Sequence, residues 1–150
     1  MKTYKTNLPE ITLKYKSGDV KKVKITCASD AAKTLKEFYD QDTIELTESV
    51  IILFLNRNNN TIGWYKVSQG GLSGTVIDNR LIIVTALNCA AHSIIISHNH
   101  PSGNTQPSQT DILITTKLKN ACDLLDIKLL DHIILTESGE FYSMADNGVI

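Results

Sequence analysis

The chain has 150 residues, 42% of them hydrophobic, which is enough to bury the core of one domain. Fifteen Lys and Arg against 16 Asp and Glu leave a formal net charge of −1, so the overall balance does not point to a nucleic-acid partner. No apolar export segment opens the chain and no apolar run reaches membrane-spanning length, so we expect a soluble protein with no membrane partner.

The first 45 residues predict a hairpin followed by a short helix. Apolar and polar residues alternate over 11–16 and 20–26, and Ser17-Gly18-Asp19 between these runs is a turn sequence. Ser29 and Asp30 are helix-starting residues, and the apolar spacing after them predicts a helix to about Tyr39. Five lysines between positions 14 and 24 alternate with apolar residues, which favours the solvated face of the hairpin over a nucleic-acid contact.

The central part of the chain predicts two paired strands and a helix. Glu48 precedes a strongly apolar run, which predicts a buried strand over residues 48–56 and a partner strand over 61–68. The glycine-rich residues 69–75 lack the lysine of a phosphate-binding loop, so we expect no nucleotide site there. Asp78 then caps a helix that is predicted to reach residue 91.

The polar stretch that begins at His98 carries the most chemistry. The apolar run 94–96 predicts a buried strand, and alternation along it puts His98 and His100 on one face. Pro101 cannot donate to a sheet ladder, so the strand ends there with both imidazoles at its carboxyl end. A helix that begins after the polar turn returns Asp111 to that strand end. Two imidazoles and one carboxylate suit a zinc ion whose fourth coordination position stays open.

Two simpler interpretations compete with this metal site. A lone HxH pattern is more often a pair of solvated strand-end histidines than a pair of ligands. Ser108 and Asp111 also fit an N-cap and its first-turn acid, a pattern close to a capping box. The capping interpretation leaves His98 and His100 without a role, so on the residues alone metal binding and plain capping both stay open.

The remaining residues predict a helix over 109–125 and strands over 127–135 and 141–143. Helices that alternate with strands around a mixed sheet indicate the α/β class. His132 follows Asp131 inside the longer of these strands. A structural histidine satisfied by its neighbours is the favoured interpretation, and donation to a carboxylate behind the metal site is the alternative.

The spacing of these residues resembles a known motif. HxH, seven residues, Ser, two residues and Asp is similar to the JAMM (MPN) metal-binding motif of metal-dependent deubiquitinase-like proteins. The fuller string HNHPSGNTQPSQTD, with Leu129-Leu130-Asp131-His132 downstream, resembles the RadC branch of that superfamily over roughly residues 45–145. This resemblance implies an α/β fold with a mixed β-sheet flanked by helices, in the cytidine-deaminase-like arrangement of JAMM/MPN domains.

The resemblance also implies the roles of five residues. The metal ligands of the family fall on His98, His100 and Asp111, with Zn2+ as the cofactor, and its motif serine falls on Ser108. Its general-base glutamate precedes a buried strand well upstream, which in this chain selects Glu48. Composition alone does not distinguish that glutamate from the others in the first half of the chain.

The expected organisation is an N-terminal hairpin and helix extension over residues 1–45 and a JAMM metal-binding domain over 46–150. Longer RadC members carry a helix-hairpin-helix region ahead of this domain, and we expect no such helices here. The favoured function is zinc-dependent hydrolysis of a peptide or isopeptide bond, with a peptide or protein as the substrate. A metal-dependent nuclease, suggested by the family's historical link to DNA repair, and a non-catalytic metal-binding interaction domain are the alternatives.

The cysteines bear on the compartment. Cys27, Cys89 and Cys122 are widely spaced and contain no CxxC pair, which favours free thiols. Free thiols are typical of a reducing compartment, so we expect a cytoplasmic location.

Overall fold

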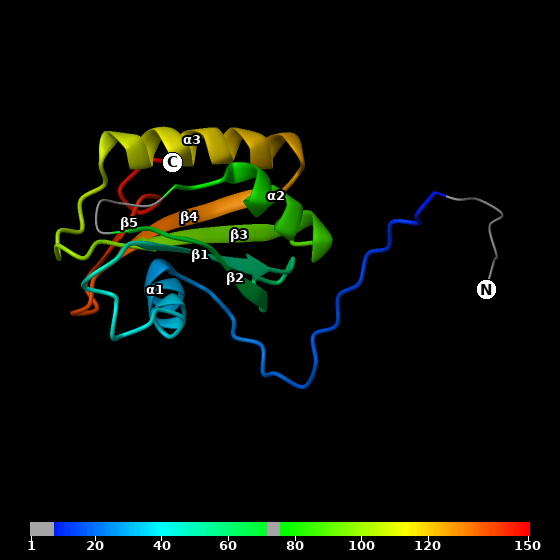
Figure 1. Cartoon of the computed structure of the whole chain (residues 1–150), viewed down its shortest axis with the longest axis horizontal. Coiled ribbons are helices and arrows are strands. Elements are labelled where there is room, and N and C mark those ends of the chain that lie inside the picture. The colour runs from blue at the N-terminus through cyan, green and yellow to red at the C-terminus, as the bar shows by residue number, and fades with distance from the viewer. Residues whose placement is uncertain (1–7, 72–75) are drawn as a thin grey trace.

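A computed structural model of the chain describes residues 8–71 and 76–150. Within those residues helices cover both faces of one mixed sheet (Figure 1). The predicted α/β class with a mixed sheet flanked by helices is therefore confirmed. In chain order the elements are α1 (Ala28–Lys36), β1 (Ser49–Leu55), β2 (Thr61–Gln69), α2 (Asn79–Asn88), β3 (Ser93–Asn99), α3 (Gln109–Leu124), β4 (Lys128–Leu135) and β5 (Phe141–Ser143).

The described part of the sheet has its strands in the order β2-β1-β3-β4-β5. β3 and β4 are parallel and are joined through α3, whereas the other neighbouring pairs are antiparallel. All seven residues of β1 and all seven of β3 are buried, because these central strands are covered on both faces. Strands of this kind have nearly continuous apolar sequences, which explains why both were predicted from the sequence.

Alternate residues of the central strands point into two separate cores. On one face of the sheet Ile51 of β1 packs with Leu35 of α1. On the other face Ile52 of β1 packs with Leu118 of α3. Figure 1 shows α1 and α3 on opposite sides of the sheet, so the side to which a strand residue points decides which helix it meets.

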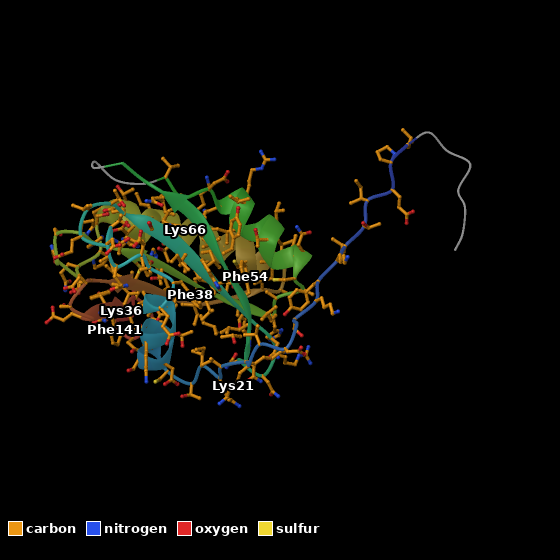
Figure 2. All side chains as sticks on the ribbon, turned by 60° about the horizontal axis from the view of Figure 1, so that its bottom comes forward. Lys21, Lys36, Phe38, Phe54, Lys66 and Phe141 are labelled. Atoms are coloured by element: carbon orange, nitrogen blue, oxygen red, sulfur yellow. The ribbon has the colours of Figure 1, made fainter. Side chains whose placement is uncertain are left out.

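The predicted hairpin over residues 11–16 and 20–26 is wrong. The chain turns at residues 18 and 19, but within residues 8–26 the structure has no strand, only an isolated bridge from Lys24 to Asn60. The first part of this segment extends away from the body of the molecule (Figure 1 and Figure 2), whereas its end reaches the sheet, where Ile25 is buried and the Val23 N–H donates to the Thr61 hydroxyl at 2.9 Å. Ile11 is 86% exposed and Val20 is 80% exposed, so the two alternating runs share no apolar surface on which a hairpin could pack. A two-stranded hairpin without such a surface is marginal in water.

Both helices predicted ahead of the strand that carries His98 are present, and their ends differ from the prediction by one to three residues. α1 begins one residue before the predicted start at Ser29 and ends three residues before Tyr39. α2 begins directly after Asp78, whose carboxylate accepts the backbone N–H of Arg80 at 2.9 Å, as its predicted role of cap requires. The part of the predicted glycine-rich loop over residues 72–75 lies outside the described residues.

The cysteines occupy three different environments and form no disulfide. Cys27 is exposed, Cys89 is half-buried and Cys122 is buried in the core beneath α3. In the described ranges, no helix combines the length and the apolar character needed to cross a bilayer. The cytoplasmic location expected from the free thiols stays a prediction.

Candidate metal centre

Both motif histidines lie at the carboxyl end of β3, on the face of the sheet covered by α2 and α3. β3 pairs antiparallel with β1 so that His98 lies opposite Val50, a residue of the core beneath those helices. Paired residues of an antiparallel sheet share a face, and the two-residue period adds His100 to it. His98 is only 2% exposed, whereas His100 at the end of the strand is half-buried. The predicted placement of the two imidazoles is confirmed.

Asp111 reaches the same point from the first turn of α3. The Ser108 Oγ accepts the Asp111 N–H at 3.1 Å, and Asp111 Oδ2 accepts the Ser108 N–H at 2.7 Å, which completes a capping box. Asp111 Oδ1 also lies 3.5 Å from His98 Nε2, and Oδ2 lies 3.8 Å from His100 Nε2. Capping and metal binding are therefore compatible, because one carboxylate can serve both.

A chain of buried hydrogen bonds sets the tautomer of His98. The Thr115 hydroxyl donates to the backbone oxygen of Asp111 at 2.6 Å, so its Oγ1 accepts from His132 Nδ1, also 2.6 Å away. Burial lowers the pKa of His132 well below its ordinary value, so this ring is neutral and its Nε2 carries no proton. His98 Nδ1 lies 2.7 Å from that nitrogen and donates to it. In the neutral ring of His98, Nε2 is therefore unprotonated, and its lone pair faces Asp111 and His100.

The loop after β3 holds His100 in the same tautomer. Its Nδ1 donates to the backbone oxygen of Asn104 at 2.5 Å, which leaves Nε2 unprotonated in the neutral ring. The Nε2 atoms of His98 and His100 are 2.9 Å apart, so two lone pairs face each other beside the carboxylate of Asp111. That arrangement is repulsive until a cation lies between the groups. The ligand atoms of these three side chains lie within 4.8 Å of one another, so together they can hold a metal ion.

Asp111 is ionised in this setting. Partial burial by itself would raise its pKa, but a hydrogen bond and a positive charge at His98, which need a proton on Nε2 in place of the metal, lower it more strongly. The two hydrogen bonds with Ser108 act in the same direction, and the net effect holds the pKa of Asp111 well below its usual range. A metal cation would act as the charge on His98 does, so the carboxylate is available as a ligand throughout the neutral pH range.

The group formed by His98, His100 and Asp111 borders a cleft of about 590 Å³. This cleft lies at the carboxyl end of β3, where the chain leads into α3. Glu48, His100 and Ser108 line this cleft and come from the residue before β1, the end of β3 and the start of α3. Val50 pairs with His98, and continuing that register by two residues sets Glu48 opposite His100 on the same face. The structure therefore brings Glu48 and Ser108 to the cleft, and their catalytic roles stay predictions.

The sequence singled out His132 but not its contact with His98, and it did not single out Thr115. His132 is a satisfied buried histidine, as favoured, but the partners of its ring are His98 and Thr115 and not a carboxylate. Thr115 lies four residues after Asp111, and residues with this spacing share a face of a helix, which is the signal that could have found it. No comparable signal exists for His132, because its approach to His98 depends on the parallel pairing of β3 and β4.

The chain matches the RadC-like JAB domain family over residues 25–149. It is 39% identical over 142 residues to a UPF0758 protein of Flavobacterium johnsoniae, which covers 93% of the chain and 60% of that protein. A UPF0758 protein of Aquifex aeolicus is 36% identical over 143 residues, covering 95% of the chain and 59% of that protein. A third, from Porphyromonas gingivalis, is 40% identical over 103 residues, covering 69% of the chain and 45% of that protein. The chain thus spans 60% or less of the length of these curated relatives.

Proposed function

Because the chain belongs to the RadC-like JAB domain family, we propose that it is a zinc-dependent hydrolase that cleaves a peptide or isopeptide bond in a protein substrate. The observation that carries the proposal is the convergence of His98, His100 and Asp111 beside a cleft that Glu48 and Ser108 also line. Two imidazoles and a carboxylate leave one position of a tetrahedral zinc open, as in catalytic sites. The two Nε2 atoms are 2.9 Å apart, close to the spacing of about 3.3 Å that tetrahedral geometry gives two nitrogen ligands of zinc.

Glu48 and Ser108 each have a defined task in this reaction, beside the metal ion. A bound zinc supplies a Lewis acid that polarises the scissile carbonyl and lowers the pKa of water to about 7. Glu48 takes a proton from the attacking water and delivers it to the leaving nitrogen, as general base and then general acid. The Ser108 Oγ accepts the Asp111 N–H at 3.1 Å, and among the described residues its hydroxyl donates to no group. That hydrogen is available to the carbonyl oxygen as negative charge develops there.

The charges around the cleft favour a polypeptide substrate over a nucleic acid. The described residues that line it include Glu48 but neither Lys nor Arg. A phosphodiester would therefore meet the charges of Glu48 and Asp111 without a compensating side-chain cation. A two-metal nuclease would also need more carboxylates than this site holds. Asn104 and Gln106 on the cleft wall offer polar groups that can bind the backbone amides of a peptide.

A cleavage panel tests the proposal. Zinc-loaded protein is incubated with unstructured peptides, ubiquitin-like conjugates and DNA, beside Glu48→Gln and the matched variant Glu45→Gln, which changes an exposed glutamate outside the cleft lining. We expect cleavage of a peptide or isopeptide bond that Glu45→Gln retains and that Glu48→Gln lowers by about 10² to 10⁴ with zinc still bound.

Two other results would contradict the proposal. DNA cleavage that Glu48→Gln abolishes would favour the nuclease alternative. If zinc-loaded protein cleaves nothing in the panel, and removal of the zinc lowers only the stability of the fold, a non-catalytic metal-binding interaction domain would be favoured.

A further inference from the structure

Asn99 lies between the two motif histidines, and its side chain points to the opposite face of β3. It is fully buried, and it forms three hydrogen bonds with backbone groups of one short segment. Its Oδ1 accepts the N–H of Ser49 at 2.7 Å. Its Nδ2 donates to the backbone oxygens of Ile44 at 2.7 Å and Thr47 at 2.9 Å. Both hydrogens of the amide and its oxygen are therefore committed to that segment.

The segment held by Asn99 carries Glu48. Between α1 and β1 the chain forms turns, so no helix or strand fixes the backbone until β1 begins at Ser49. Asn99 bonds to Thr47 and Ser49, the two neighbours of Glu48 in the chain. From the other side, the Gly70 N–H donates to the backbone oxygen of Glu48 at 2.8 Å. The peptide units on both sides of Glu48 are thus tied to the strand end that carries the metal group.

We infer that Asn99 is a positioning residue: its amide fixes the backbone around Glu48 and so holds that carboxylate at the cleft beside His98 and His100. The inference rests on the proposed function, because it concerns the base of that reaction. Alternation along β3 sends Asn99 to one face and the two histidines to the other, so a single strand end sets the distance between the base and the metal group. Displacement of a reacting group by 1 Å can cost roughly 10²-fold in rate.

If Asn99 had only a structural role, its loss would lower stability without a specific effect on turnover or on the segment around Glu48. Truncation of a buried side chain that satisfies three backbone groups lowers stability wherever it occurs. Ser97 is the matched control, because it lies two residues earlier on the same face of β3, is buried, and bonds to the Tyr39 hydroxyl at 2.9 Å. Ser97→Ala therefore removes a buried hydrogen bond from the same strand without touching the segment around Glu48.

The test compares Asn99→Ala, Asn99→Asp, Ser97→Ala, Glu48→Gln and the double variant Asn99→Ala/Glu48→Gln. Asn99→Asp keeps the acceptor for Ser49 and loses both donations, so it serves if Asn99→Ala does not fold. Amide hydrogen exchange over residues 44–49, zinc content, and kcat and KM on the best substrate of the cleavage panel are measured for each. The exchange measurement is independent of activity.

We expect the Asn99 variants to keep zinc. The amide hydrogens of residues 44–49 should exchange at least about 10-fold faster than in wild type. The kcat should fall about 10²-fold with little change in KM. The double variant should be no slower than Glu48→Gln, because both changes disable the same base. Ser97→Ala should keep both kcat and slow exchange of that segment. Unchanged exchange in both Asn99 variants, or a double variant slower by the product of the two single losses, would overturn the inference. If wild type cleaves nothing in the panel, the proposed function fails, and exchange alone decides whether Asn99 holds the segment.

Discussion

The buried His132 predicts that the metal-free protein loses stability in mild acid. Burial lowers the pKa of this imidazole well below its ordinary value, and the ring is fully buried between His98 and Thr115. In the unfolded chain the same imidazole titrates near its ordinary pKa of about 6.5. Below that pH the unfolded state binds a proton that the folded state does not, so the free energy of unfolding falls as the pH falls.

The magnitude follows from the linkage relation for one group. With an unfolded pKa of about 6.5 and a folded pKa far below it, lowering the pH from 7.5 to 5.0 costs RT ln[(1 + 10^1.5)/(1 + 10^−1.0)], which is about 2 kcal/mol. Asp111 adds nothing over this range, because its pKa is lowered in the folded state. Its stabilisation is complete above the ordinary unfolded pKa of about 3.9 and is lost only at more acid pH.

Urea unfolding of chelator-treated protein between pH 7.5 and 5.0 measures this loss. His132→Gln lowers stability at every pH because it breaks the contacts with His98 and Thr115, but it should remove about 2 kcal/mol of the pH dependence. His92→Gln is the matched control: it removes a half-buried histidine just before β3 and leaves the buried ring of His132 in place, so comparison of the two variants isolates the contribution of His132. A His132→Gln protein with the same pH dependence as wild type would refute the reasoning.

Three further predictions concern the site and the core. Ser108→Ala should lower the free energy of unfolding by about 1 kcal/mol through loss of the cap, and should lower turnover by about 10² with zinc retained; unchanged turnover would remove this hydroxyl from the mechanism. Protein purified without chelators should carry about one zinc per chain by elemental analysis, and His98→Ala or Asp111→Ala should lose it; metal-free wild type with no zinc uptake would contradict the site assignment. Leu35→Ala should cost about 2–5 kcal/mol in urea unfolding, because this fully buried side chain joins α1 to the sheet; a loss under about 1 kcal/mol would contradict that packing.

The sequence predicted well where one element alone determines the outcome. The strand that carries His98 and His100 was recognised from its continuous apolar run, and Pro101 marked its end. The capping box formed by Ser108 and Asp111 depends only on the spacing of two residues at the start of one helix, so its prediction required no knowledge of the tertiary structure.

Prediction failed where the result depends on contacts between distant segments. The alternating pattern of residues 11–26 is typical of a hairpin, but Ile11, Leu13 and Val20 cover no apolar surface, and the two runs do not pair. Asn99 reads as the variable position of HxH, and its bonds to the residues around Glu48 follow only from the pairing of β1 with β3. His132 likewise meets His98 because β3 and β4 are parallel neighbours.

The most direct test of the account is an anomalous difference map from crystals of zinc-loaded protein, recorded on both sides of the zinc absorption edge. The account predicts a single strong peak about 2.0–2.1 Å from the Nε2 atoms of His98 and His100, with the Asp111 carboxylate as the third protein ligand. Because Nδ1 of each ring is already hydrogen-bonded, coordination through Nε2 is a specific consequence of this structure. A zinc peak at the cysteines, coordination through Nδ1, or no peak in crystals that contain zinc would contradict the central claim.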